Sequence, residues 1–211
     1  MPVIDIRERA ALADDDPHAR VIAATLRCVA KWGINKTTLE DVARESGLSR
    51  ATVYRVAPGG KESLLELVAA AELNRFFLAL DAAVRDLDTL EEVLVAGVVT
   101  AARHLTEHAA LNFMIEHEPD QILPWFAFTN LDVILANVRV FAAPYVERWL
   151  GDDAGHSAEW LARIVLSYVC TPSAEFDLAD EESARRLVRT FVLPGIRNLS
   201  STSTSSISST A

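Results

Sequence analysis

The stretch that decides the fold runs from Thr37 to Val56 and reads TTLEDVARESGLSRATVYRV. Thr37 and Glu40 have the spacing of a capping box, which predicts that a helix begins here. Gly47 is predicted to end it, because a tight turn between helices requires a positive φ that glycine adopts without strain. Ser49 is a helix-capping residue type, so a second helix is predicted to run from there to about Val56.

The apolar residues of this stretch separate a buried face from an outward face. Leu39, Val42 and Ala43 lie on one side of the first helix. Val53 is the apolar anchor of the second helix. That helix then presents hydroxyls and two guanidiniums outward: Ser49, Arg50, Thr52, Tyr54 and Arg55. Such side chains suit phosphates and base edges, so the pattern predicts a helix-turn-helix whose second helix enters the major groove of double-stranded DNA.

Charge is distributed unevenly along the chain. Its 211 residues carry 20 Lys+Arg against 30 Asp+Glu, a net charge of −10. Residues 17–61 nonetheless hold eight basic residues, Lys36 and Lys61 among them, against three acidic ones, a net charge of +5. A basic segment beside an acidic body indicates a polyanion-binding module. Chance clustering on a solvated helical surface is the alternative.

Helix signals recur along the whole chain, which we predict to be all-α. Asp16-Pro17 and Gly33 bracket a first helix, and a long helix is predicted from Lys61 to Arg85. Further helices are predicted over roughly 89–105, 107–117, 122–149, 156–171 and 180–198. We expect an N-terminal arm over 1–16, a helix-turn-helix domain over 17–60, a larger effector-binding and dimerisation domain over 61–199, and a disordered Ser/Thr-rich tail over 200–211.

Composition excludes several classes of protein. Apolar residues make up 50% of the chain and charged residues 24%, as in folded globular proteins. Cys28 and Cys170 are far apart and form no CxxC motif, which argues against a disulfide framework or a zinc knuckle. The sequence contains neither a signal-peptide pattern nor an apolar stretch long enough to cross a membrane. We therefore expect a cytoplasmic protein that does not bind membranes.

The residues from Ile22 to Leu65 resemble the DNA-binding domain of the TetR family of bacterial transcriptional regulators. The landmarks are Trp32-Gly33, Thr37-Thr38, Val42-Ala43, Gly47-Leu48-Ser49, Thr52-Val53-Tyr54 and the run from Gly59 to Leu65, GGKESLL. The resemblance implies that Thr38 caps its helix and touches phosphate. It also implies that Arg50 and Thr52 reach bases, and that Tyr54 and Lys61 bind phosphate. An ammonium at a helix N-terminus favours an anion in the same way.

One position departs from the family pattern. Family members usually carry an aromatic residue, typically Phe, where this chain has Ala57. That aromatic residue packs the small DNA-binding domain onto the fourth helix. Its absence either loosens this joint or leaves Val56 and Trp32 to fill the space.

Beyond residue 65 the resemblance lies in the layout of the helices, and it implies a homodimer. Two late helices carry apolar stripes at helical spacing, and their candidate interface residues are Leu161, Ile164, Val165, Tyr168, Leu187, Val188 and Phe191. Each stripe can face either the core of its own chain or a symmetry mate, and the resemblance implies the second. Because one short recognition helix makes few base contacts, a two-fold pair on a palindromic operator is favoured.

Aromatic residues gather in the middle of the larger domain, where the resemblance places a ligand pocket. An apolar lining with a few polar groups suits a small, largely apolar effector. The candidate ligand-binding residues are Phe76, His104, Phe113, Trp125, Phe128, Phe141 and Tyr145. Core packing is the alternative for each ring. No cofactor is expected.

We do not expect an enzyme. His104, Glu107 and His108 match the HxxEH pattern of inverted zinc peptidases, but the likeness stops at those five residues and a solvated helix face explains them. No metal site is predicted, and neither a Gly-rich phosphate loop nor a GxSxG motif is present. We predict a ligand-released repressor. The alternative is a helical protein-interaction module that has lost specific DNA binding.

Overall fold

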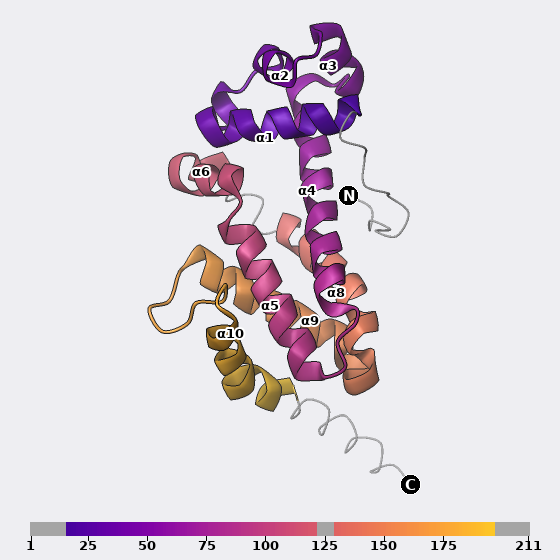
Figure 1. Ribbon diagram of the computed structural model, residues 1–211, viewed down its shortest axis with the longest axis vertical. Coiled ribbons are helices and arrows are strands. Elements are labelled where there is room, and N and C mark those ends of the chain that lie inside the picture. Colours follow the sequence, from indigo (N-terminus) through magenta and orange to yellow (C-terminus); the bar gives the residue numbers. More distant parts are fainter. Residues whose placement is uncertain (1–15, 122–128, 197–211) are drawn as a thin grey trace. The chain divides into compact units, whose positions relative to one another are not determined.

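The computed structural model describes residues 16–121 and 129–196, and every regular element in these two ranges is helical (Figure 1). This confirms the all-α prediction. The described residues form two compact units. The helix-turn-helix unit comprises residues 16–77, 107–121 and 129–130, and the C-terminal unit comprises 78–106 and 131–196. Within the described ranges no helix combines the length and the apolar character needed to cross a bilayer.

The first helix, α1 (Pro17–Lys36), begins where predicted and runs past the glycine expected to end it. A carboxylate oxygen of Asp16 accepts a hydrogen bond of 2.9 Å from the backbone N–H of His18, and Pro17 fills the first helical position. Gly33 adopts a φ of +83° and kinks the chain, after which a last turn continues to Lys36. Only glycine takes this backbone conformation without strain.

The next two helices form the predicted helix-turn-helix. α2 (Leu39–Ser46) begins one residue later than predicted, because the capping box joins Thr38 to Asp41. Thr37 is buried instead, and its hydroxyl donates to the carbonyl oxygen of Gly33 at 2.7 Å. Gly47 takes the expected left-handed conformation with a φ of +66°, and Ser49 caps α3 (Arg50–Val56).

Ala57 closes the core of this unit. Its side chain is fully buried in the cluster that also holds Val42 and Val53, and Trp32 and Val56 pack against the same cluster. The structure thus places Ala57, Trp32 and Val56 in one apolar cluster. α4 (Gly60–Val84) follows directly and contributes residues to both units, and α6 (Ala109–His117) packs against α1.

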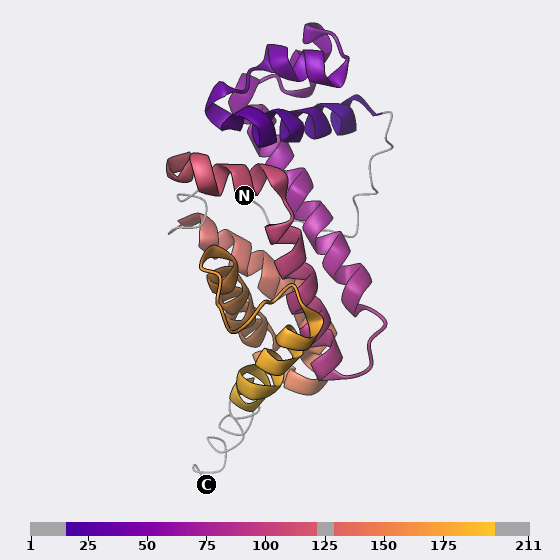
Figure 2. The ribbon, with the colours of Figure 1, turned by 60° about the vertical axis from the view of Figure 1, so that its left-hand side comes forward.

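In the C-terminal unit, helices surround α5 (Leu90–Thr106), which contacts both α9 (Ala154–Cys170) and α10 (Glu181–Leu187) (Figures 1 and 2). The other elements are α8 (Thr129–Leu150), the 3₁₀ turn η1 (Gly151–Asp153) and the π-helical turn η2 (Val188–Val192), which continues α10. The predicted helices over 89–105, 107–117, 156–171 and 180–198 match these elements to within a few residues. The start of the predicted helix over 122–149 lies outside the described residues, as do residues 1–15 of the predicted arm and the predicted tail.

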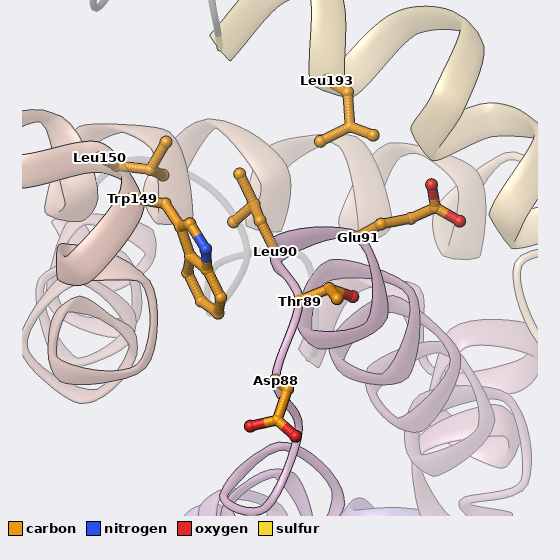
Figure 3. Close-up of a pocket in the computed structure, with 7 residues that line it drawn as sticks. All are labelled: Asp88, Thr89, Leu90, Glu91, Trp149, Leu150 and Leu193. Atoms are coloured by element: carbon orange, nitrogen blue, oxygen red, sulfur yellow. The ribbon is translucent and has the colours of Figure 1, made fainter.

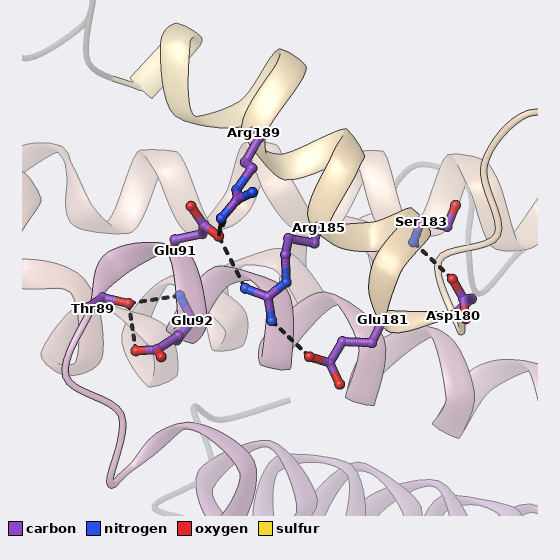
Figure 4. A network of polar contacts seen from close by, with 8 residues as sticks. All are labelled: Thr89, Glu91, Glu92, Asp180, Glu181, Ser183, Arg185 and Arg189. Atoms are coloured by element: carbon purple, nitrogen blue, oxygen red, sulfur yellow. Dashed lines mark hydrogen bonds and ion pairs between the residues drawn. The ribbon is translucent and has the colours of Figure 1, made fainter.

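A carboxylate–guanidinium network joins α5 to the C-terminal helices (Figure 4). One carboxylate oxygen of Glu91 lies 3.1 Å from Arg185 and 2.9 Å from Arg189, and Arg185 also contacts Glu181 at 2.7 Å. Hydrogen bonds from Arg189, and then from Arg185, hold the pKa of the Glu91 carboxyl below its ordinary value of 4.5. Folding therefore stabilises the ionised form of this group.

We expect Glu91→Gln to lower the free energy of unfolding at neutral pH by about 0.5–1 kcal/mol, a small effect because the network is partly solvated. A carboxyl whose pKa is lowered by folding stabilises the fold above its ordinary pKa and loses this contribution as the pH falls through the lowered value. The difference between wild type and variant should therefore shrink below pH 4.5. Urea unfolding at a series of pH values measures it, with the exposed Glu182→Gln as the control. An equal difference at all pH values would contradict the assignment.

Candidate nucleic-acid interface

The outward face of α3 is built by its caps and its buried anchor. The Ser49 hydroxyl accepts a hydrogen bond of 3.1 Å from the Thr52 backbone N–H, which fixes the start of the helix. Val53 is fully buried, so the residues on the other side of the helix face outward. Tyr54 is 48% exposed, a large value for an aromatic side chain, and Arg50 and Arg55 are exposed as well. This is the polar face that the sequence predicted.

Arg50 is held only loosely. Its guanidinium lies 3.5 Å from the carboxylate of Glu40, and the two side chains are 63% and 64% exposed. An exposed pair of this kind contributes little stability. The guanidinium is therefore free to exchange Glu40 for a base edge or a phosphate at small cost.

Lys61 stands at the second position of α4. Its ammonium donates a hydrogen bond of 3.1 Å to the backbone carbonyl oxygen of Asn35, in the last turn of α1. This contact brings Lys61 to the segment that carries the exposed Lys36. The two ammonium groups thus belong to neighbouring parts of the unit.

Thr38 is placed at the start of α2, where its hydroxyl serves as the helix cap. The hydroxyl donates to a carboxylate oxygen of Asp41 at 2.6 Å and accepts from the Asp41 backbone N–H at 3.2 Å. The hydrogen bond from Thr38 is the main cause of a lowered pKa for the Asp41 carboxyl, with Arg44 adding to it. The capping role is thus present in the structure, whereas the phosphate contact of Thr38 stays a prediction.

The predicted ligand-binding residues fall in both units. Phe113 stacks on His117 in the helix-turn-helix unit, with ring centroids 4.4 Å apart, and Phe76 lies in α4 of the same unit. His104, Phe141 and Tyr145 belong to the C-terminal unit, where the Tyr145 hydroxyl donates to the Asp81 carboxylate. Trp125 and Phe128 lie outside the described residues. A ligand-binding role for these side chains stays a prediction.

A cavity of about 470 Å³ opens in the C-terminal unit between the start of α5, the end of α8 and Leu193, which directly follows η2 (Figure 3). Its apolar walls come from the Trp149 indole and from three leucines, and its polar residues lie just before α5 and in the first turn of that helix. The lining residues are Asp88, Thr89, Leu90, Glu91, Trp149, Leu150 and Leu193. None of them was predicted from the sequence, because they come from three distant segments and share no motif.

His108 of the HxxEH pattern has another role in the structure. The Nδ1 atom of His108 accepts a hydrogen bond of 3.1 Å from the Leu111 backbone N–H and so caps α6. Its Nε2 atom lies 2.9 Å from a carboxylate oxygen of Glu72 on α4. With one ring nitrogen accepting, the proton is on the other, which donates to Glu72. Both nitrogens are thus used within the chain. No cluster of three or more metal-ligating side chains occurs in residues 16–121 and 129–196.

The candidate dimer residues divide into buried and accessible ones. Val165, Leu187 and Val188 are at most 4% exposed and belong to the core of their own chain, so they offer no surface to a partner. Leu161, Ile164 and Tyr168 are half-buried, and Phe191 is 56% exposed. Trp160 is 41% exposed as well, and it was not among the interface residues predicted from the sequence. The signal that points to it is the four-residue spacing of 160, 164 and 168.

Comparison with known proteins agrees with this geometry. Residues 21–68 match the family described as bacterial regulatory proteins, tetR family. An HTH-type transcriptional regulator of Mycobacterium tuberculosis strain H37Rv is 34% identical over 53 residues, which are 25% of this chain and only 28% of the relative's length. The capped helices, the glycine turn and the polar face of α3 therefore form a helix-turn-helix DNA-binding domain. Residues 21–68 thus match the DNA-binding domain of the TetR family of regulators.

Solved structures share the fold over most of the chain. The TetR family repressor AlkX of Dietzia sp. strain DQ12-45-1b, implicated in biodegradation of n-alkanes, aligns with a TM-score of 0.62 and 19% identity over 89% of this chain and 98% of its own. The fatty acid degradation regulator FadR of Bacillus halodurans aligns with a TM-score of 0.59 and 16% identity over 85% and 96%. At these identities the likeness establishes the fold.

Proposed function

We propose that the protein is a dimeric, ligand-responsive repressor of transcription in the cytoplasm. The observation that carries this proposal is the outward face of α3, where Arg50, Tyr54 and Arg55 are exposed around a fully buried Val53. Arg50 and Thr52 read base edges in the major groove, and Tyr54, Lys36 and Lys61 bind phosphates. An occupied operator near a promoter then excludes polymerase.

The dimer forms through the accessible part of the late helices. Trp160, Phe191 and the half-buried Leu161, Ile164 and Tyr168 provide large apolar side chains that a second copy covers. A two-fold interface presents two α3 helices to a palindromic site, with half-sites one helical turn or a multiple apart. Two recognition helices make enough base contacts for specific binding, which one seven-residue helix does not.

The effector is a small, largely apolar molecule. The aromatic side chains predicted from the sequence suit such a ligand, and the cavity beside Trp149 has a volume typical of small-molecule sites. AlkX is implicated in biodegradation of n-alkanes and FadR is a fatty acid degradation regulator, which makes acyl and alkyl compounds the first to test. The effector releases the operator if it binds one conformer better than the other. A thermal-shift screen with these compounds tests this, and Trp149→Ala tells whether the cavity binds them.

Fluorescence anisotropy with DNA from upstream of the protein's own gene tests the proposed function. A scrambled duplex of equal length is the control, and both are measured across a salt series. Tight binding to the upstream DNA, with two chains per site, supports the proposal. Equal and salt-sensitive binding to both duplexes would mean that the protein does not recognise this sequence specifically. No binding at low salt would favour the protein-interaction module.

Lys61→Ala is expected to weaken binding to all DNA alike and to reduce the salt slope by about one per half-site, because each phosphate contact releases condensed counterions. The salt series above measures both quantities. Lys31→Ala is the matched control, since Lys31 is exposed and its ammonium lies over the Trp32 ring. If Lys61→Ala changed the sequence preference and left the salt slope untouched, Lys61 would not be a phosphate contact.

A further inference from the structure

A carboxylate from outside the first four helices is bound in the kink of α1. Glu118 directly follows α6, and its two carboxylate oxygens accept hydrogen bonds from the backbone N–H groups of Ile34, at 2.6 Å, and Asn35, at 3.2 Å. Both N–H groups point at one carboxylate directly after the positive φ of Gly33, and successive N–H groups in a turn form an anion-binding concavity. All of these residues belong to the helix-turn-helix unit.

The kink accommodates this carboxylate only because residue 33 is glycine. A Cβ atom at position 33 would lie 2.5–2.6 Å from the carboxylate atoms of Glu118, closer than Cβ atoms come, so it would displace the carboxylate. Gly33 is therefore required twice, for its φ of +83° and for the space that Glu118 fills.

The same turn of α1 holds Lys61. Asn35, whose N–H donates to Glu118, presents its carbonyl oxygen to the Lys61 ammonium at 3.1 Å. The buried Thr37 ties the turn together through its hydroxyl bond to the Gly33 carbonyl oxygen, and α2 begins two residues later. One peptide segment thus connects a carboxylate 83 residues further along the chain to the start of α4.

We propose that Glu118 is a positioning residue for DNA binding. By fixing the turn at 33–36, its carboxylate sets where Asn35 holds Lys61 before DNA arrives, so that the ammonium meets a phosphate without reordering. This rests on the proposed function of Lys61 as a phosphate contact. Neutralising or removing the carboxylate frees the two N–H groups, lets the turn rearrange and leaves Lys61 to sample many positions.

A double-mutant cycle tests this directly. Glu118→Ala is expected to raise the Kd for upstream and scrambled DNA alike by about threefold to tenfold, in the range of coupling between groups that share partners. In a Lys61→Ala background the same change should have almost no effect. Glu118→Gln keeps one acceptor oxygen and should fall in between. Glu116→Ala removes a carboxylate two residues away that is 78% exposed, and it should bind DNA as wild type does.

Amide hydrogen exchange gives a readout that does not need DNA. Ile34 and Asn35 should lose protection in Glu118→Ala and keep it in Glu116→Ala. If wild type binds DNA but Glu118→Ala binds equally well, or weakens binding to the same extent with and without Lys61, the positioning role is wrong and the proposed function stands. If wild type fails to bind any DNA, the proposed function itself fails and takes this role with it.

Discussion

Arg50→Ala is expected to raise the Kd for the operator by about 30-fold or more and to flatten the preference for it over other sequences. A well-placed guanidinium–base contact contributes about 1–3 kcal/mol, and the contact is lost in both half-sites of a dimer. The structure makes Arg50 the best candidate on α3, because its side chain is 63% exposed and gives up only a loose contact with Glu40. Anisotropy titrations against the operator and single-base variants measure the effect.

Two variants separate base recognition from simple charge. Arg50→Lys keeps the positive charge but loses the fork of donors that fits a guanine. It should therefore bind DNA with the salt dependence of wild type but with the weak sequence preference of Arg50→Ala. Arg27→Ala removes the same charge from α1, where the guanidinium pairs with Glu45 at 2.6 Å, and it should leave the preference intact. If Arg50→Lys bound the operator like wild type, Arg50 would be a phosphate contact.

The local structure of the helix-turn-helix unit was predictable because its signals lie within a few residues of each other. Asp16-Pro17, Gly47 and Ser49 each act on a helix end next to them, and all three do so in the structure as predicted. The capping box was shifted by one residue, since two threonines stand side by side and either has the required hydroxyl. Burial distinguishes the two threonines: Thr37 is only 3% exposed, whereas Thr38 occupies the N-cap position of α2.

Gly33 shows why contacts between distant parts of the chain could not be predicted from the sequence. A glycine after an apolar helical pattern predicts a helix end, and the positive φ that this requires is present. The chain then resumes a helical turn whose first N–H groups need an acceptor. That acceptor is Glu118, which lies 84 residues after Ile34. No short-range pattern in the sequence pairs the two.

The late helices illustrate a second limit. Their periodicity predicted apolar stripes, and the stripes exist, but a repeat of 3.6 residues cannot say whether a stripe faces its own core or another molecule. The structure divides the set: Val165, Leu187 and Val188 fill the core, whereas Phe191 is mostly exposed. The Phe191 ring contacts the buried Phe176 ring, with centroids 6.0 Å apart, and the Phe176 ring contacts that of Tyr168, with centroids 6.3 Å apart.

Phe191→Glu is therefore expected to convert the dimer to monomers and to weaken operator binding by about 100-fold or more. The change places two carboxylates in one two-fold interface, without partners and out of water. The loss in DNA affinity is large because coupling two recognition helices raises the affinity for a palindrome by about 10²–10⁴ over one alone. Sedimentation velocity measures the oligomeric state, and anisotropy against full and half operators measures the coupling.

Two further variants identify the cause of any loss. Phe191→Leu keeps an apolar side chain and should remain dimeric, which shows that polarity and not ring loss breaks the interface. Val140→Glu puts the same charge on an α8 side chain that is 59% exposed and outside the proposed interface, so it should stay dimeric too. Binding to a half operator should be nearly equal in all three variants, because α3 lies in the other unit. A Phe191→Glu protein that remains dimeric would place the interface on another face, and Trp160→Glu would then be the variant that decides whether α9 takes part at all.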